Sequence, residues 1–246
     1  MLSPVLADLI GFHAPLSVVQ REQGGAVTLL TPGVNVLALN ATFLPGDVTG
    51  VDLRDVQDWH EGQGLPPLVA WAGSEVPAGL KVKEVARVRV GRWSGRPDPL
   101  DAPAGKQVVV EQVGRLHLSA WAGALCAAHG TPGWAAGLAR QLAGPLEAAA
   151  GPGTAGAFAL LMAYRDGQPV GSLLWQARGT GGAAHLWGAA DAGAGVALLN
   201  AAAGLGADLT VTLPGAGEWD GPFLHAVTDV RYGLLVPVPG APTQSR

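Results

Sequence analysis

One stretch of the sequence, WGAADAGAGVALLNAAAGLGADLTVTLP at Trp187–Pro214, constrains the fold more than any other. It predicts a strand, a turn with Gly193 and Gly195, a helix of small residues and a second strand. A turn of this kind places backbone N–H groups at a helix N-terminus, where an anion such as a pyrophosphate binds. The stretch therefore predicts either an anion-binding turn or a tight connection between two strands.

The composition predicts a globular protein. Of the 246 residues, 48% are hydrophobic and 14% are charged, so the chain can bury a core. Its net charge is -4, and no cluster of Lys and Arg is present, so we expect no nucleic-acid partner. The single Cys126 excludes an intrachain disulfide and a cysteine-based zinc site, and it suits a reducing cytosol.

Membrane and metal sites are not expected either. No basic leader precedes Asp8, which argues against a signal peptide. The longest apolar run, Ala192–Ala207, is shorter than the roughly 20 residues of a membrane span. The histidines show no spacing typical of a metal site. We expect a cytoplasmic protein with no metal and no membrane partner.

The first half predicts short elements separated by Pro and Gly. In chain order they are a helix and a polar turn at 1–25, strands at 26–31 and 34–40, a helix at 51–64, a strand at 65–73, and an edge strand ending at 93 with arginines facing water. Residues 94–107, rich in Pro, Gly and Asp without periodicity, predict a linker.

The second half predicts a longer alternation of strands and helices. In chain order they are a strand at 108–113, a helix at 114–130, a helix capped by Thr131 and broken or kinked at Pro145, a hairpin at 157–178, a strand at 183–189, a helix at 195–206, a strand at 208–214, a helical piece near 219–227 and a strand at 232–239. Asp166-Gly167 predicts a two-residue turn in the hairpin.

This order of elements resembles the fold of the GCN5-related N-acetyltransferases (GNAT). AYRDGQPVGSLLWQ, at 163–176, resembles the family's hairpin, and residues 183–213 resemble the strand, loop, helix and strand of its acetyl-CoA site. LRDVQDWHEGQGLPPLVAWAGSEVPAGL resembles the degenerate upstream half of some members. The resemblance implies an α/β fold (mixed α+β), a mixed sheet flanked by helices. It divides the chain into a reduced N-terminal GNAT-like half (1–93), a linker (94–107) and a C-terminal GNAT-like domain (108–246).

The resemblance also implies acetyl-CoA as acyl donor. The backbone N–H groups of four consecutive residues would hold its pyrophosphate: Gly193, Ala194, Gly195 and Val196. The sequence departs from the family here, because Asp191 stands where the loop usually brings Arg or Gln, and the loop is short. No Lys or Arg lies between Arg178 and Arg231, so the acidic residues of this segment, Asp191 among them, have no cation nearby in the sequence. Each contact between such a carboxylate and a phosphate costs about 1–4 kcal/mol. Basic residues from elsewhere, such as Arg140 or Arg178, could compensate.

Two catalytic roles follow from the same resemblance. His185, on the strand before the loop, would be the general base that takes a proton from the acceptor ammonium. A strand histidine satisfied by hydrogen bonds is the alternative interpretation. Phe223 aligns with the family's proton-donating tyrosine, so Tyr232 or His225 would have to protonate the leaving thiolate.

Two functions remain open from the sequence. The first is an acyl-CoA-dependent N-acetyltransferase that acts by direct transfer on a small-molecule, peptide or protein amine. The second is a catalytically lapsed GNAT-fold binding or scaffold protein that no longer binds acetyl-CoA tightly. Trp175 and Trp187, on the two strands flanking the predicted cleft, would line an acceptor pocket or pack in the core.

Overall fold

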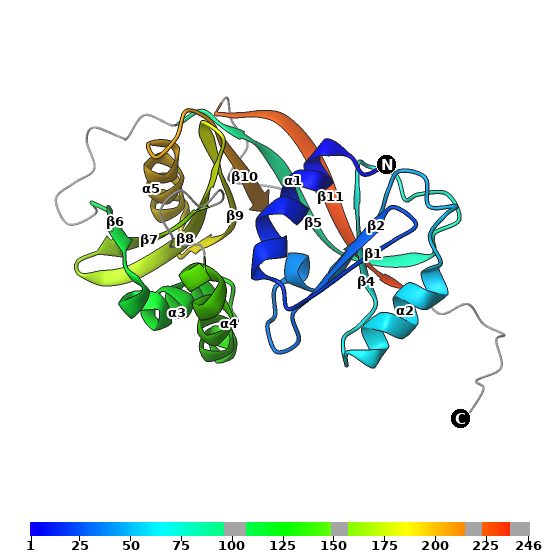
Figure 1. The fold of residues 1–246 in the computed structure, drawn as a ribbon. Helices are drawn as coiled ribbons and strands as arrows, with labels where there is room; N and C mark the ends of the chain where they lie inside the picture. Colours follow the sequence, from blue (N-terminus) through cyan, green and yellow to red (C-terminus); the bar gives the residue numbers. More distant parts are fainter. Residues whose placement is uncertain (96–106, 149–156, 215–222, 237–246) are drawn as a thin grey trace.

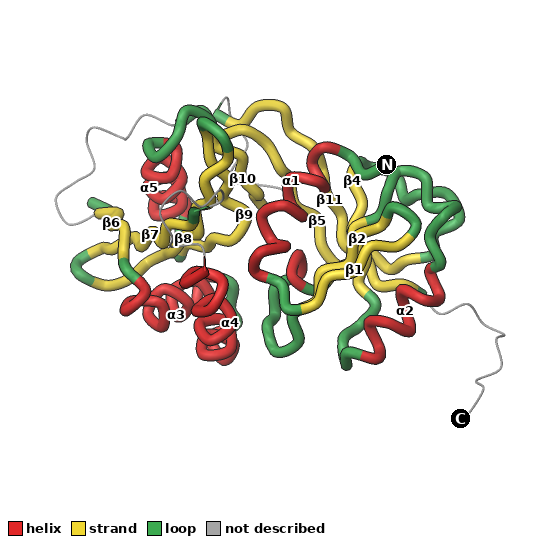
Figure 2. The backbone as a smooth tube through the Cα atoms, in the orientation of Figure 1, coloured by secondary structure: helices red, strands yellow, loops and turns green. Residues whose placement is uncertain are grey.

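Two long antiparallel strands, β5 (Val82–Trp93) and β11 (Leu224–Leu235), run through the centre of an eleven-stranded sheet. The computed structural model describes residues 1–95, 107–148, 157–214 and 223–236 (Figure 1). The strand order is β1-β2-β3-β4-β11-β5-β10-β9-β8-β7-β6. Figure 2 shows these strands as a layer that continues from one half of the molecule into the other.

The other elements lie to either side of this central pair. The remaining strands are β1 (Val19–Gln23), β2 (Ala26–Leu30), β3 (Ala41–Phe43), β4 (Leu68–Ala72), β6 (Val109–Val113), β7 (Phe158–Arg165), β8 (Gln168–Arg178), β9 (Gly181–Ala189) and β10 (Leu209–Pro214). The α-helices are α1 (Pro4–His13), α2 (Leu53–Gly62), α3 (Leu118–Ala128), α4 (Ala135–Ala148) and α5 (Ala192–Ala203). The 3-10 helices are η1 (Ala14–Leu16), η2 (Leu37–Leu39), η3 (Arg115–His117) and η4 (Pro132–Trp134).

The two halves exchange their last strands. β5 follows β4 in the chain but pairs with β10, whereas β11 follows β10 and pairs with β4. Outside this centre each half has one parallel pair, β3 with β4 and β9 with β10, joined through α2 and α5 respectively. The sheet is therefore approximately symmetric about the β5–β11 pair, and strands of both halves alternate at its centre.

Helices cover both faces of the sheet. On one face, α1 packs on β2, β4, β5 and β11, and α3 and α4 pack on β7, β8 and β9. On the other face, α2 covers β4 and α5 covers β7 to β10. The cluster under α3 and α4 also contains Phe12, Leu16, Val34 and Leu39 from the first half. Because one buried cluster takes side chains from both halves, burial of apolar surface holds them together.

The predicted strand, helix and strand of Trp187–Pro214 are confirmed as β9, α5 and β10. The hairpin is confirmed as well, with Asp166 and Gly167 both at positive φ, as a type I′ turn requires. The predicted mixed α/β fold with a flanked mixed sheet is also confirmed. No helix in the described ranges is long and apolar enough to span a membrane.

Three predictions in the first half are wrong. Of the polar turn predicted at 20–25, residues 20–23 belong to strand β1, and only Gly24 and Gly25, both at positive φ, form the turn into β2. Residues 34–40 are not a strand, because the side chain of Asn40 accepts from Thr31 N–H and donates to the Val34 carbonyl, which holds the loop in a bend. The strand ending at 93 lies at the centre of the sheet and not at its edge, because β10 and β11 pair on its two sides.

Three expectations in the second half change too. Thr131 makes no side-chain cap, and α4 continues through Pro145 to Ala148. Of the helical piece near 219–227, residues 224–227 are strand, because Leu224 and His225 pair with β5; residues 219–222 lie outside the described ranges. Residues 96–106 of the predicted linker also lie outside the described ranges.

The central position of β11 leads to a prediction about stability. Val230 is fully buried on β11, whereas Val227 on the same strand is 45% exposed. We expect Val230→Ala to lower the free energy of unfolding by about 2 kcal/mol, and Val227→Ala by less than about 0.5 kcal/mol. Thermal unfolding followed by circular dichroism and tryptophan fluorescence should show one shifted transition. Two transitions, of which one shifts, would contradict the exchange of strands as a unifying contact.

Candidate functional site

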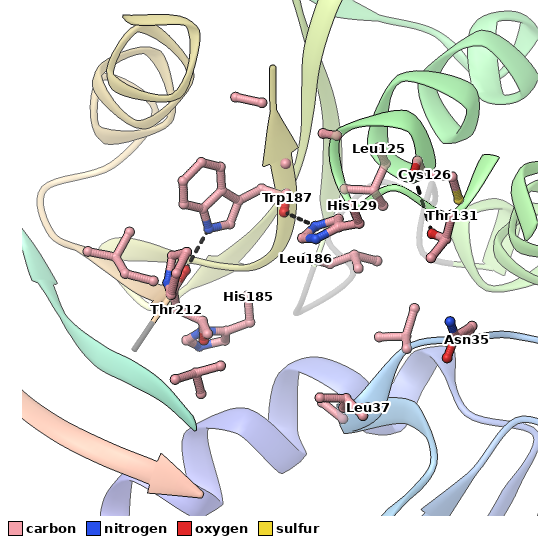
Figure 3. Close-up of a pocket in the computed structure, with 18 of the residues that line it drawn as sticks. Asn35, Leu37, Leu125, Cys126, His129, Thr131, His185, Leu186, Trp187 and Thr212 are labelled. Carbon is pink, nitrogen blue, oxygen red and sulfur yellow. Dashed lines mark hydrogen bonds between the residues drawn. The ribbon is translucent and has the colours of Figure 1, made fainter. Parts of the chain in front are cut away.

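The parallel strands β9 and β10 diverge after a short pairing. They pair over three residues, from Gly182–Leu209 to Ala184–Val211. Beyond this point side chains bridge the two strands. Trp187 Nε1 donates to the Thr212 carbonyl at 2.6 Å, and His185 Nδ1 lies 2.8 Å from Thr212 Oγ1 (Figure 3). The two strands therefore diverge, and the chain's own side chains lie across the gap.

The N-terminus of α5 is capped by Asp191. Its Oδ1 accepts from the Ala194 N–H at 3.0 Å. Arg165, at the end of β7, donates to both oxygens of the same carboxylate, at 2.7 and 3.1 Å. These bonds, first of all the one from Arg165, lower the pKa of Asp191 to about 2. The carboxylate is therefore ionised and lies where an anion would bind to the helix.

The four residues expected to hold a pyrophosphate are not equally available. Gly193 is exposed, whereas Ala194, Gly195 and Val196 are buried in α5. The Ala194 N–H is already bonded to the Asp191 side chain, and the Gly195 N–H donates to the Asp191 carbonyl at 3.1 Å. The compensating charge comes from Arg165, not from Arg140 or Arg178, the two examples named from the sequence. The separation of 26 positions hides this pairing from a local reading of the sequence.

His185 lies at the contact between α1 and the second half. Its Nε2 donates to Asp8 Oδ2 at 2.9 Å, since an ionised carboxylate can only accept. Nδ1 is hydrogen-bonded to the Thr212 hydroxyl, so both ring nitrogens have partners. Burial alone would raise the pKa of Asp8, but the bond from His185 and the charge of Arg178 lower it below its ordinary value. His185 thus holds α1 against β9 through an ionised carboxylate.

Next to this pair is a second buried histidine, which the sequence did not indicate. His13 ends α1, and its Nδ1 donates to the Leu9 carbonyl at 2.9 Å. Burial, and then the neighbouring His185, lower the pKa of His13 to about 3, so the ring is neutral. Its Nε2 is buried and has no hydrogen-bond partner among the described residues. In the neutral ring this atom is an acceptor without a donor.

These groups surround a cavity of ≈ 680 Å³ where the two halves meet. Its walls are β9, the end of β10, helices α1 and α3, and the loop before η2 (Figure 3). His13, His185 and Tyr232 all line it, and Asp191 lies at its end towards α5. The structure therefore brings the two residues predicted as catalytic, His185 and Tyr232, to one cavity.

Tyr232 belongs to the buried centre of β11. Burial raises the pKa of its phenol above the ordinary value, so the hydroxyl stays protonated. The other proton-donor candidate, His225, is exposed, lies 3.2 Å from Ser94 Oγ and does not line the cavity. Phe223, which aligns with the family's tyrosine, contacts Trp93 and does not line the cavity.

Two further candidates differ in position. Trp187 lines the cavity, whereas Trp175 packs in the cluster under α5 and does not. Cys126, on α3, lines the cavity, but burial raises the pKa of its thiol and so disfavours the thiolate. Among the described residues, no group of His, Cys, Asp or Glu is placed to hold a metal ion.

Comparison with known proteins gives similarity in structure but not in sequence. No protein-family model and no curated protein matches the chain. A GCN5-related N-acetyltransferase from Kribbella flavida is 18% identical, with 98% of each chain covered and a TM-score of 0.56. A GNAT-family protein from Novosphingobium aromaticivorans is 12% identical, with 94% of this chain and 97% of that chain covered and a TM-score of 0.51.

A protein of unknown function from Staphylococcus epidermidis has a similar structure as well, with 11% identity, 89% of this chain and 94% of that chain covered, and a TM-score of 0.55. These alignments cover most of the chain, so the similarity extends over both halves. This chain therefore has the fold of the GCN5-related N-acetyltransferases, as its sequence predicts.

Proposed function

We propose that this chain is a GNAT-fold binding protein in which the acetyl-CoA site has lapsed. The observation that carries the proposal is the Asp191 carboxylate at the N-terminus of α5, bonded to Ala194 N–H and to Arg165. The helix N-terminus that would hold a pyrophosphate already has an anion of the chain's own. Acetyl-CoA does not fit this arrangement as it stands.

Electrostatics opposes displacement of this carboxylate by a phosphate. An incoming pyrophosphate would meet the Asp191 charge at a few ångströms, at a cost of about 1–4 kcal/mol per contact. Arg165, the one cation bonded to Asp191 in the described ranges, would have to leave its carboxylate to bind the phosphate. The attraction between Arg165 and a bound phosphate would therefore be offset by the loss of the attraction between Arg165 and Asp191.

Side chains that lie between the diverging strands β9 and β10 also oppose binding of the extended arm of CoA. Diverging strands leave backbone groups that an extended amide chain, such as the arm of CoA, could bond. Here Trp187 Nε1 donates to the Thr212 carbonyl, and His129 Nε2 donates to the Trp187 carbonyl at 2.9 Å. Side chains of the protein thus satisfy two carbonyls that a bound amide chain would otherwise use.

A second candidate function is an N-acetyltransferase for a small-molecule, peptide or protein amine. Two observations favour it: the structural neighbours with GNAT names, and the meeting of His185 and Tyr232 at one cavity. The geometry of His185 weakens it. A base must offer a lone pair, and the His185 nitrogens are engaged by Asp8 and Thr212. We therefore place the lapsed site first.

The first test is acetyl-CoA binding. We expect the wild type to give no heat in isothermal titration and no thermal shift with 1 mM acetyl-CoA. Asp191→Asn keeps a good helix cap but removes the charge and releases Arg165, so it should gain a thermal shift. Asp166→Asn, a matched control next to Arg165 on an exposed turn, should behave as the wild type. Micromolar binding by the wild type would contradict the proposal.

A second prediction concerns the pH dependence of stability. The pKa of Asp191 falls from an ordinary 3.8 to about 2 on folding, so its ionised form stabilises the native state above about pH 4. That contribution is lost as the pH falls through about 2. Asp191→Asn should lower the free energy of unfolding at pH 7 by less than about 1 kcal/mol, because the pair is open to solvent. Chemical denaturation should show this difference vanish near pH 2, and a difference that persists there would argue against the ion pair.

A third measurement separates the two candidate functions. Release of free CoA thiol, followed with acetyl-CoA and a panel of small amines and peptides, should stay at the background rate for the wild type. Measurable transfer that His185→Gln abolishes would establish the acetyltransferase and end the lapsed-site proposal. Transfer that survives both His185→Gln and Tyr232→Phe would instead indicate a contaminating enzyme.

A further inference from the structure

The cavity between the two halves is of a size that suits a small molecule. Its ≈ 680 Å³ falls within the range of about 300–1,000 Å³ found for ligand sites. It lies between β9, α3 and the loop before η2, with α1 alongside (Figure 3). Much of its wall is apolar, including Leu125, Leu138 and Leu186. These observations describe a binding site that extends from the capped end of α5, where Asp191 and Ala192 line it, to α1.

The charges around the cavity are already balanced. Asp8 is bonded to His185 and lies 3.9 Å from Arg178, and Asp191 is bonded to Arg165. A cationic ligand would find no carboxylate here without a cation of its own. Arg87, half-exposed and 3.7 Å from Glu84, is the described cation in the lining. The lining therefore favours an uncharged ligand.

Two polar groups of the lining have no hydrogen-bond partner among the described residues. His13 Nε2 is a buried acceptor in a neutral ring. The Tyr232 hydroxyl, on the neighbouring strand β11, is a donor for which the described residues supply no acceptor. Buried polar groups are almost always satisfied, by the protein or by a bound molecule. A ligand that supplies one donor and one acceptor would satisfy both.

We propose that this cavity binds an uncharged, mostly apolar small molecule, with a hydroxyl that donates to His13 Nε2 and an oxygen that accepts from the Tyr232 hydroxyl. The proposal rests on the proposed function, because it gives the lapsed GNAT fold a ligand of its own. It differs from an amine acceptor, which is a cation, and from acetyl-CoA, which carries phosphates, because it is uncharged. His185 is a positioning residue in this site, since it fixes α1, which carries His13.

The experiment uses naphthalene probes on the full chain. 2-Naphthol has a hydroxyl that both donates and accepts, 2-methoxynaphthalene has an acceptor without a donor, and 2-naphthylmethylamine is a cation at pH 7. We expect 2-naphthol to bind about fivefold more tightly than 2-methoxynaphthalene by ligand-observed NMR titration, the effect of one hydrogen bond. The amine should bind more weakly than both.

Variants assign the two bonds. His13→Phe should weaken 2-naphthol about fivefold and leave 2-methoxynaphthalene unchanged, because the ether never donated to His13. Tyr232→Phe should weaken both probes, because both accept from the hydroxyl. His117→Phe, at an exposed position, is the matched control and should change neither. Thermal unfolding of each variant shows whether it is folded, and Tyr232→Phe tests the site independently if His13→Phe is not.

The outcomes distinguish the proposed ligand from the proposed loss of the acetyl-CoA site. Equal affinity of the wild type for 2-naphthol and 2-methoxynaphthalene, no binding of either at millimolar concentration, or tighter binding of the amine would overturn the ligand proposed here. Acetyl-CoA titrated into the same samples tests the lapsed site separately. Binding of acetyl-CoA with no binding of 2-naphthol would reject both proposals, and binding of neither would reject the ligand alone.

Discussion

The pairing of β5 with β11 is the interaction on which the rest of this structure depends. Neither strand has its neighbour in the chain beside it, since β4 lies against β11 and β10 lies against β5. Removal of either strand would expose the backbone groups of a strand from the other half, at the centre of the sheet. The two halves are therefore held together by main-chain hydrogen bonds as well as by packed side chains, and the cavity lies along the seam between them.

Helix α1 completes that seam. It packs on the central strands through Leu6 and Leu9, while Asp8 on the same helix reaches His185 in the second half. Arg178 adds a bond to the Asp8 carbonyl at 3.3 Å. Buried ionic contacts of this kind stabilise little by themselves, but they fix orientation once apolar packing has placed the elements. The position of His13 at the cavity follows from this orientation.

Local patterns in the sequence predicted the elements well where a local cause exists. Asp166 and Gly167 both adopt positive φ, so the turn follows from residue type alone. The strand, turn and helix around Asp191 follow from periodicity and glycine spacing. The order of these elements, compared with a known family, also gave the fold. The helix expected near 219–227 fails at Leu224 and His225 because pairing with β5, a long-range contact, decides their conformation.

The chemistry of the site was harder to predict because its contacts are distant in sequence. Asp8 and His185 are 177 positions apart, and Arg165 and Asp191 are 26 apart. The sequence placed Asp191 at the start of the helix, and Asp191 does cap α5, but nothing near it indicated the arginine that neutralises it. The sequence did not indicate a role for His13 either. A histidine at the end of a helix is common, and only its burial, which leaves Nε2 without a partner among the described residues, sets this one apart.

The capped helix and the bridged strands have one physical reason in common. A helix N-terminus and a pair of diverging strands both expose backbone groups that need partners, whether a cofactor supplies them or the chain does. In this chain a carboxylate takes the place of a phosphate at α5, and an indole N–H bonds a carbonyl on β10 that an amide could have bonded. Both sets of backbone groups therefore have partners within the chain. The cavity beside α1 differs in this respect, because the buried His13 Nε2 in its lining has no partner among the described residues.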